Sequence, residues 1–266
     1  MEPFEFTSGS VPLLLSIPHC ATQLPPEIAA TMTPAALELT DTDWHVDTLY
    51  DFAGDMGIGV IRPRYSRYVI DLNRPPDDSE LYPGANGTGL CPTTTFANEA
   101  LYRQGHEPDD AEIARRLDSW WRPYHSKLQS ELQRLRERHG VALLFEAHSI
   151  ASVVPRLFEG QLPDLNVGTA DGASCAPALM QQVQTVLDGQ SKYSHVTNGR
   201  FKGGYITRAY GQPEKGVHAL QLELAQCNYM DEKPPFTYLP EEAEHLRHLL
   251  RQLLRRILDW GEAQAA

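Results

Sequence analysis

Short apolar runs, each bounded by glycine, proline or polar residues, are the feature that most restricts what this chain can fold into. Runs of this length are typical of β-strands, because the helices of globular proteins are longer. Several runs are apolar at nearly every position, which indicates strands that are covered on both faces, as in a parallel or mixed sheet between helices. The predicted strands cover residues 11–17, 59–63, 68–72, 141–147 and 218–224.

Amphipathic patterns lie between and after these runs. Residues 42–57 carry apolar side chains at spacings of three and four. Residues 108–140 begin with acidic side chains and end at Gly140, as the two ends of a helix favour, and Pro123 is expected to kink or split this helix. Two further helices are predicted over residues 175–187 and 240–261.

The order of these segments predicts the fold class. Strands that alternate with helices indicate an α/β fold with a mixed, largely parallel central sheet flanked by helices. No repeat or linker interrupts residues 1–266, so a single domain is expected. Two long irregular stretches, residues 73–96 and 152–174, are rich in proline and glycine. Loops of this length in a compact domain are usually functional.

Charge and targeting signals narrow the classes of partner. The formal net charge is −12, so nucleic acid and anionic membranes should repel the chain, although a locally positive pocket can still bind a small anion. The N-terminus lacks the pattern of a signal peptide, and the apolar runs are too short to span a membrane. Four cysteines without a CxxC pair fit a reducing cytoplasm. The oligomeric state is left open.

Ionisable residues stand at or near the ends of the apolar runs. His19 follows the first run, Asn73 and Arg74 follow the third, His148 ends the fourth, and Glu223 lies in the last. In open α/β sheets, ligands bind in the crevice at the carboxyl ends of the strands. These residues are therefore predicted to share one site.

Two of these residues, His19 and His148, are candidate metal ligands. Taken alone, each fits a hydrogen-bonded core histidine better than a ligand, but the pair with nearby acids favours zinc, which binds histidine nitrogen and carboxylate oxygen. A catalytic zinc has three protein ligands, so a third is required. The residues that qualify by type and proximity are Asp43, His45, Asp47 and Glu146.

The remaining candidates are charged residues suited to substrate binding or proton transfer. Arg67 and Arg74 flank the third run, and a guanidinium matches a carboxylate in a bidentate manner. Arg208 belongs to a basic segment with paired glycines, residues 198–213, which indicates anion binding or an ordinary turn. Glu223 has apolar neighbours, so it is either the partner of a buried arginine or the general base that deprotonates a water.

Taken together, these segments resemble the N-formylglutamate amidohydrolase family over roughly residues 10–235. The resemblance implies an α/β fold similar to that of zinc carboxypeptidases and aspartoacylases. It also implies hydrolysis of N-formyl-L-glutamate to formate and L-glutamate, the last step of a histidine degradation route. The segments that carry it, in chain order, are "SIPH", "DTDWHVDTLYDFA", "YSRYVIDLNRPPDD", "LYPG", "WRPYH", "EAHSI", "LPDLNVGT", "NGRFKGGYITRAYG" and "QLELAQCNYM".

The resemblance also implies roles for single residues. His19 and His148 correspond to zinc ligands, Asn73 and Arg74 to a pair that binds a substrate carboxylate, and Glu223 to the catalytic glutamate. Zinc carboxypeptidases have a further glutamate ligand three residues after the first histidine, where this chain has Thr22. Asp43 is the expected third ligand instead, because it matches the family's "DTDW".

The expected cofactor is Zn²⁺ or another divalent transition metal, and the expected partner is a small anionic substrate derived from an amino acid. Arg67, Asn73, Arg74 and Arg208 are expected to hold its carboxylates. Two other functions fit the same residues. One is a deacylase for another N-acyl amino acid, similar to aspartoacylase or succinylglutamate desuccinylase, and the other is a catalytically silent protein that binds acidic ligands.

Overall fold

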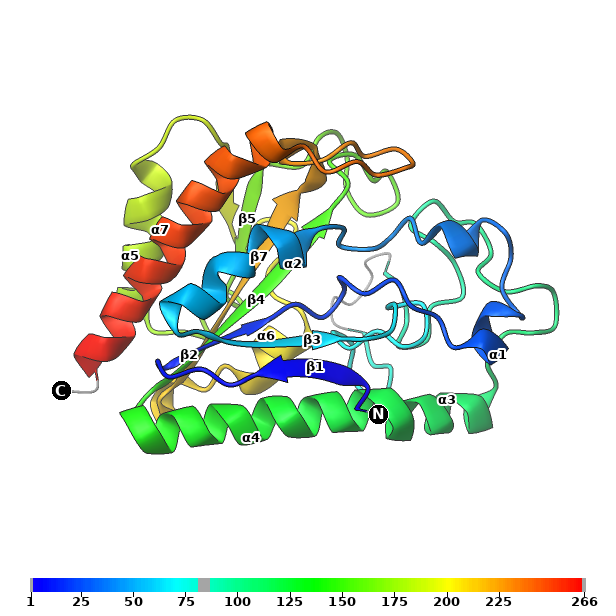
Figure 1. Cartoon of the computed structure of the whole chain (residues 1–266), viewed down its shortest axis with the longest axis horizontal. Coiled ribbons are helices and arrows are strands. Elements are labelled where there is room, and N and C mark those ends of the chain that lie inside the picture. Colours follow the sequence, from blue (N-terminus) through cyan, green and yellow to red (C-terminus); the bar gives the residue numbers. More distant parts are fainter. Residues whose placement is uncertain (1, 81–86, 265–266) are drawn as a thin grey trace.

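A mixed β-sheet forms the centre of the molecule in the computed structural model, which describes residues 2–80 and 87–264. The strand order is β1-β3-β2-β4-β7-β5-β6, and β3, β2, β4 and β7 run parallel in its middle. β1 and β5 are antiparallel to their inner neighbours (Figure 1). The strands are β1 (Phe4–Thr7), β2 (Leu13–Ser16), β3 (Gly59–Pro63), β4 (Ala142–Ile150), β5 (Leu165–Gly168), β6 (His195–Thr197) and β7 (Val217–Ala225).

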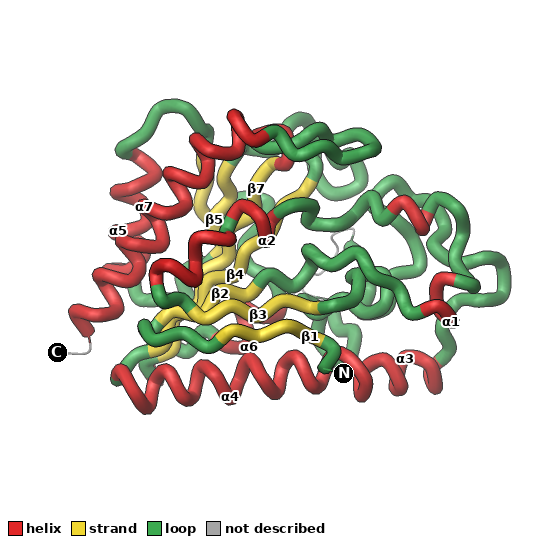
Figure 2. Tube along the Cα trace, viewed as in Figure 1, coloured by secondary structure: helices red, strands yellow, loops and turns green. Residues whose placement is uncertain are grey.

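Helices cover the sheet on both faces, which confirms the predicted α/β fold. α4 and α6 pack against β4 on one side, whereas α7 packs against β4 on the other and carries α5 beside it (Figures 1 and 2). The α-helices are α1 (Pro26–Ala29), α2 (Val46–Leu49), α3 (Asp110–Arg116), α4 (Arg122–His139), α5 (Pro177–Asp188), α6 (Tyr205–Tyr210) and α7 (Pro240–Gln264). Short 3₁₀ turns are η1 (Ala36–Glu38), η2 (Asp51–Met56), η4 (Pro213–Lys215) and η5 (Gln226–Asn228), and η3 (Leu117–Trp121) is a π-helix.

Side-chain alternation along the central strands divides the core into two layers. In β4, Leu143, Phe145 and Ala147 belong to the cluster with α5 and α7, whereas Ala142 and Leu144 belong to the cluster with α4. Successive side chains of a strand point to opposite faces. The α7 side of β4 is therefore apolar along this length, but the α4 side is apolar only in its first half.

The predicted strand over residues 68–72 is wrong. The segment is buried, with Tyr68, Val69 and Ile70 at most 3% exposed, but it forms turns and pairs with no strand among the described residues. Its apolar side chains fill the core between the sheet and the long helix. Burial alone produced the same sequence pattern that a covered strand would show.

Other details of the fold refine these expectations. Residues 42–57 form the short helix α2 and the turn η2 rather than the one predicted helix. The long helix is split directly before Pro123, as expected, and the split takes the form of the π-helix η3. The strands β1, β5 and β6, each of three or four residues, were not predicted.

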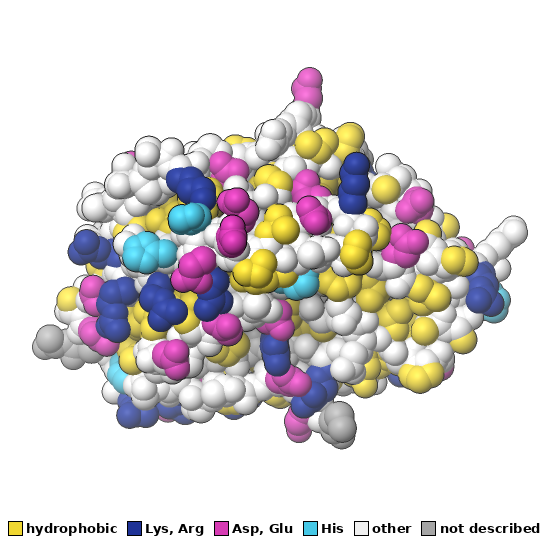
Figure 3. All heavy atoms as spheres, turned by 45° about the horizontal axis from the view of Figure 1, so that its top comes forward, with side chains coloured by type: hydrophobic (Ala, Val, Ile, Leu, Met, Phe, Trp, Pro, Cys, Tyr) yellow, Lys and Arg dark blue, Asp and Glu magenta, His cyan; other side chains and the backbone are white. Residues whose placement is uncertain are grey.

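The outer face of α7 is charged. Arg251, Arg255 and Asp259 are exposed on it, whereas Leu250 and Leu254 are buried against the sheet. Figure 3 shows acidic and basic side chains interspersed over this side of the molecule. None of the helices in residues 2–80 and 87–264 is both long and apolar enough to cross a bilayer.

Candidate active site

The candidate site begins where the α4 side of the sheet turns polar. After Leu144, the next two side chains on that face of β4 are Glu146 and His148, and both are buried. They lie beside Gln221 and Glu223 of the neighbouring strand, because the register pairs Glu146 with Gln221 and His148 with Glu223. The carboxyl ends of two central strands therefore carry a row of polar side chains on one face.

Three residues of this row, His148, Gln221 and Glu223, line a cavity of about 330 Å³ at the carboxyl ends of the strands. The loops after β2, β3 and β4 form its other walls, together with residues 200–204. Its polar and charged lining includes His19, Arg67, Asn73, Arg74, Asp78, His148, Arg200, Gln221 and Glu223. The apolar wall consists of Phe96, Ile150, Leu157 and Phe201. The predicted meeting of the run ends is therefore present in the structure.

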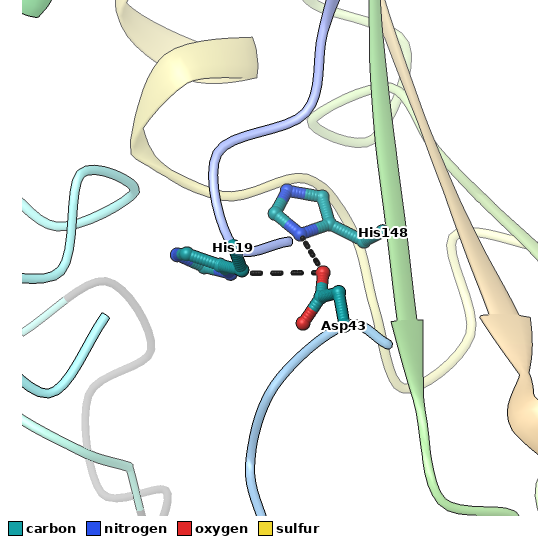
Figure 4. A group of neighbouring side chains, drawn as sticks. All are labelled: His19, Asp43 and His148. Atoms are coloured by element: carbon teal, nitrogen blue, oxygen red, sulfur yellow. Dashed lines mark hydrogen bonds and ion pairs between the residues drawn. The ribbon is translucent and has the colours of Figure 1, made fainter. Parts of the chain in front are cut away.

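Three buried ligand-type side chains meet beneath this cavity. Nδ1 of His148 lies 2.9 Å from Oδ2 of Asp43, and Nδ1 of His19 lies 3.8 Å from the same oxygen (Figure 4). Donor atoms of the three residues all lie within 4.8 Å of one another. Two donors at about 2.1 Å from a tetrahedral ion are about 3.4 Å apart, so the spacing suits a metal such as zinc.

The hydrogen bonds of the two histidines also fit a metal. Nε2 of His19 is bonded to Asp71 at 2.7 Å, whereas its buried Nδ1 has no hydrogen-bond partner among the described residues. Burial alone would lower the pKa of His148, yet the hydrogen bonds with Asp43 and Glu146 raise that pKa well above its ordinary value. The carboxylates around His148 thus favour a cation at this position, which a divalent ion would supply.

In both histidines, the nitrogen that faces away from Asp43, Nε2, lies within hydrogen-bond distance of a carboxylate. Glu146 lies 3.0 Å from Nε2 of His148 and accepts a hydrogen bond from Thr207, so it orients the ring from behind. Asp71 has the same place behind His19 and also binds Arg67 at 2.7 Å. Despite its burial, the charges of His19 and Arg67 hold the pKa of Asp71 well below its ordinary value. Such outer carboxylates fix the tautomer and orientation of metal-binding histidines.

Among the candidates for the third ligand, the structure places Asp43, and not His45 or Asp47, beside the two histidines. Nε2 of His45 lies 2.6 Å from the carbonyl oxygen of Phe236, and Asp47 forms an ion pair with Arg62 at 2.6 Å. Neither belongs to the cluster of His19, Asp43 and His148. Asp43 lies beside both histidines, because its backbone N–H donates to the carbonyl of His19 and its Oδ2 lies 2.9 Å from Nδ1 of His148.

Glu223 has the surroundings of a general base. It is 6% exposed and lines the cavity beside His148, and the amide of Gln221 donates to its Oε2 at 3.2 Å. Burial raises the pKa of Glu223 to about 8. A carboxylate with such a pKa accepts a proton near neutral pH far more readily than an ordinary glutamate does.

The neighbouring segment, residues 71–74, supplies a polar wall. The side chain of Asn73 is fixed from both ends, because Nδ2 lies 3.0 Å from Nε2 of His148 and Oδ1 accepts a hydrogen bond from the N–H of Ile206 at 2.9 Å. Arg74 reaches along the wall, where its Nε donates to the carbonyl of Thr88. Both residues line the cavity, as expected for substrate contacts.

The two arginines of the 198–213 segment have different positions. Nε of Arg208 donates to the carbonyl of Gly203, and Arg208 is not among the residues that line the cavity. Its contact with a substrate stays a prediction. Arg200 does line the cavity and is anchored through Nε to the carbonyl of Leu157. Sequence reasoning missed Arg200, although the basic composition of this segment was the available signal.

Comparison with known proteins decides the family. The sequence profile of the N-formylglutamate amidohydrolases matches residues 11–230. The chain belongs to the N-formylglutamate amidohydrolase family. It is 52% identical to an N-formylglutamate deformylase from Pseudomonas aeruginosa, over all of this chain and 99% of that protein. A second N-formylglutamate deformylase, from Pseudomonas putida, is 52% identical over 96% of each chain.

A solved structure of an N-formylglutamate amidohydrolase agrees with this membership, and a second solved structure shares the fold. The crystal structure of an N-formylglutamate amidohydrolase from Ralstonia eutropha superimposes with a TM-score of 0.82 and 26% identity, over 99% of this chain and 98% of that one. A gene product from Agrobacterium tumefaciens shares the fold, with a TM-score of 0.72, 16% identity and coverage of 97% and 94%.

The segments that resembled the N-formylglutamate amidohydrolase family converge in space. "SIPH", "DTDW" and "EAHSI" supply the metal-type cluster, and "QLELAQ" supplies Glu223. "DLNR" and residues 200–204 form the walls of the cavity. The "LYPG" segment lies outside the described residues.

Proposed function

We propose that this chain hydrolyses N-formyl-L-glutamate to formate and L-glutamate, as the last step of a histidine degradation route, with residues 1–266 acting as one catalytic domain. The observation that carries the proposal is the joint lining of a single cavity. His19, His148 and Glu223 face it, and so do Arg67, Arg74 and Arg200. A dianionic substrate therefore meets basic side chains beside the groups suited to amide hydrolysis.

The metal in this proposal is Zn²⁺ or a similar divalent ion, held by His19, Asp43 and His148. A bound ion of this kind lowers the pKa of a water and polarises a carbonyl oxygen. The protein holds the ligand set rigidly, because all three residues are at most 3% exposed and both imidazoles are backed by the carboxylates of Asp71 and Glu146.

Glu223 carries the proton in the proposed reaction. Its carboxylate accepts a proton from the attacking water, whose oxygen bonds to the formyl carbon. The carbon–nitrogen bond then breaks, and Glu223 gives the proton to the amine of the departing glutamate. The pKa of about 8 that burial gives Glu223 suits both steps, since a base must take and release its proton near the working pH.

The substrate's carboxylates are assigned to the walls of the cavity. Asn73, Arg74 and Arg200 offer amide and guanidinium donors there. Arg67 also faces the cavity, but its charge is shared with Asp71 at 2.7 Å and Asp43 at 3.7 Å. We therefore assign Arg74 and Arg200 the larger part in binding the carboxylates and Arg67 a supporting part.

A panel of N-acyl amino acids tests the function. Formate release from N-formyl-L-glutamate is expected, whereas N-acetyl- and N-succinyl-L-glutamate should be cleaved at least about 100-fold more slowly, a difference that a well-fitted pocket can reach. Faster release of acetate or succinate would make the chain a different deacylase. Tight binding of N-formylglutamate by the zinc-loaded protein without any product would make it a silent binding protein.

Gly204→Ala is expected to lower kcat/KM for N-formylglutamate by at least about 10-fold, because a small misplacement in a site is costly. The backbone at Gly204 tolerates alanine, with φ −78. A Cβ there would lie only 2.2 Å from Nδ2 of Asn73, so the Asn73 side chain must leave its place beside His148.

Gly54→Ala is the matched control for steady-state kinetics, because a Cβ at Gly54 meets nothing within 4 Å. It should leave kcat/KM unchanged. Equal kinetics of the Gly204→Ala and Gly54→Ala variants would show that the position of Asn73 does not matter to the reaction.

A further inference from the structure

Residues 68–74 include three residues of the site, Asp71, Asn73 and Arg74. This segment forms turns outside the sheet, so no neighbouring strand in the described part of the chain forms hydrogen bonds with its backbone. Its carbonyl groups are instead bonded by side chains from a later part of the chain. The donors are Tyr102 to the carbonyl of Tyr68, Arg116 to Val69, His125 to Leu72 and Trp121 to Arg74, at 3.3, 2.9, 2.9 and 3.0 Å. The last two bonds hold the carbonyls of the residues on either side of Asn73.

The π-helix η3 makes this arrangement possible. Arg116 and His125 are nine residues apart, so in a regular α-helix, at about 100° per residue, they would point to opposite sides. In η3 the N–H of Arg122 bonds the carbonyl of Leu117, five residues earlier. A π-bulge adds one residue to a turn, so the nine residues span the angle of eight, and the two side chains come within about 80° of each other.

Trp121 and His125 form a rigid pair. Their rings are stacked with centroids 3.7 Å apart. Because a carbonyl oxygen can only accept, Nε2–H of His125 donates to the carbonyl of Leu72, and Nδ1 lies 2.9 Å from the hydroxyl of Tyr210. Both ring nitrogens are thus engaged, and the imidazole cannot turn without losing two hydrogen bonds.

We propose that Trp121 and His125 are positioning residues, which fix the carbonyl groups of Leu72 and Arg74 and thereby hold Asn73 and Arg74 against the cavity. Neither residue lines the cavity itself. The inference rests on the proposed function in one respect, the binding of a substrate carboxylate by Arg74. It assigns a role to the "WRPYH" segment, which none of the catalytic steps uses.

Trp121→Phe tests the proposal, because it keeps an aromatic ring for stacking and removes only the Nε1–H donor. KM for N-formylglutamate should rise about 10-fold, the scale of one lost hydrogen bond to a carbonyl. The value of kcat should stay within about twofold, since the lost bond is to Arg74, whereas Asp71 keeps its own bonds to His19 and Arg67. Trp120→Phe is the matched control, because Trp120 packs against Tyr65 and Arg115 outside the cavity, and its KM should not change.

A double-mutant cycle separates positioning from general destabilisation. Arg74→Ala should raise KM by itself, and adding Trp121→Phe should raise it no further, because coupled residues are not additive. Additive effects of the two changes, or an equal rise in KM for Trp120→Phe, would overturn the proposal.

Hydrogen exchange provides a measurement that needs no turnover. The amides of residues 68–80 should exchange at least about 5-fold faster in Trp121→Phe than in the wild type or in Trp120→Phe, because the segment loses an anchor. Unchanged exchange would overturn the proposal. If the wild-type protein releases no formate, the proposed function fails, and the exchange experiment still decides whether Trp121 holds this segment.

Discussion

Glu223→Gln is expected to lower kcat for formate release by at least about 10³-fold, within the range attributed to general acid–base groups. Glutamine has nearly the same shape as glutamate but cannot take a proton from water. Glu223 is buried beside His148 and is not among the residues of the metal-type cluster. The variant should therefore keep both its metal content and its affinity for N-formylglutamate.

The measurement combines steady-state kinetics with metal analysis and calorimetric titration of substrate. Glu223→Asp retains a carboxylate that is shorter by one methylene, so it should recover part of the lost rate. A glutamine variant with a nearly normal kcat would remove Glu223 from the proton transfer. Loss of metal together with loss of rate would instead give Glu223 a role in holding the ion.

Asp43→Asn is expected to remove most of the bound zinc and to lower turnover by more than about 100-fold, the upper range for partners one step further from a metal. The change replaces the oxygen that faces both histidines with a neutral amide. Asp47→Asn is its matched control. Asp47 is four residues away and is paired with Arg62 outside the cavity.

Titration of zinc into metal-stripped protein measures the difference directly. Wild type and Asp47→Asn should bind about one ion per chain, with turnover restored by zinc and abolished by a chelator. Zinc binding by Asp43→Asn with wild-type affinity would exclude Asp43 as a ligand. Loss of zinc from Asp47→Asn alone would make that residue the third ligand.

The strands with the clearest pattern could be predicted because their successive side chains alternate between the two faces of the sheet. In "ALLFEAHSI", every second residue from Leu143 to Ala147 is apolar, and the alternate positions change from apolar to Glu146 and His148. This change marks the point at which the α4 layer ends and the cavity begins. The shared position of His19, His148 and Glu223 followed from it.

The rest depends on contacts that the sequence does not display. Residues 68–72 are apolar like a covered strand, but their carbonyls are bonded by side chains more than 30 positions away. The partnership of Asp71 with His19 crosses 52 positions, so no local spacing could reveal it. Arg200 and Arg208 lie in one basic segment, and only the path of the backbone decides which of them lines the cavity.

The alternation of β4 and β7 has a consequence for how this protein can change over evolutionary time. In β7, each residue that lines the site is followed directly by one that packs under α7, as Gln221 is by Leu222 and Glu223 is by Leu224, and in β4 the buried Glu146 is followed by Ala147 in the same way. Point substitutions on one face can therefore alter substrate preference while the other face preserves thermal stability. The insertion or deletion of a single residue in either strand would exchange the two faces, so these strands should tolerate substitutions but not changes of length.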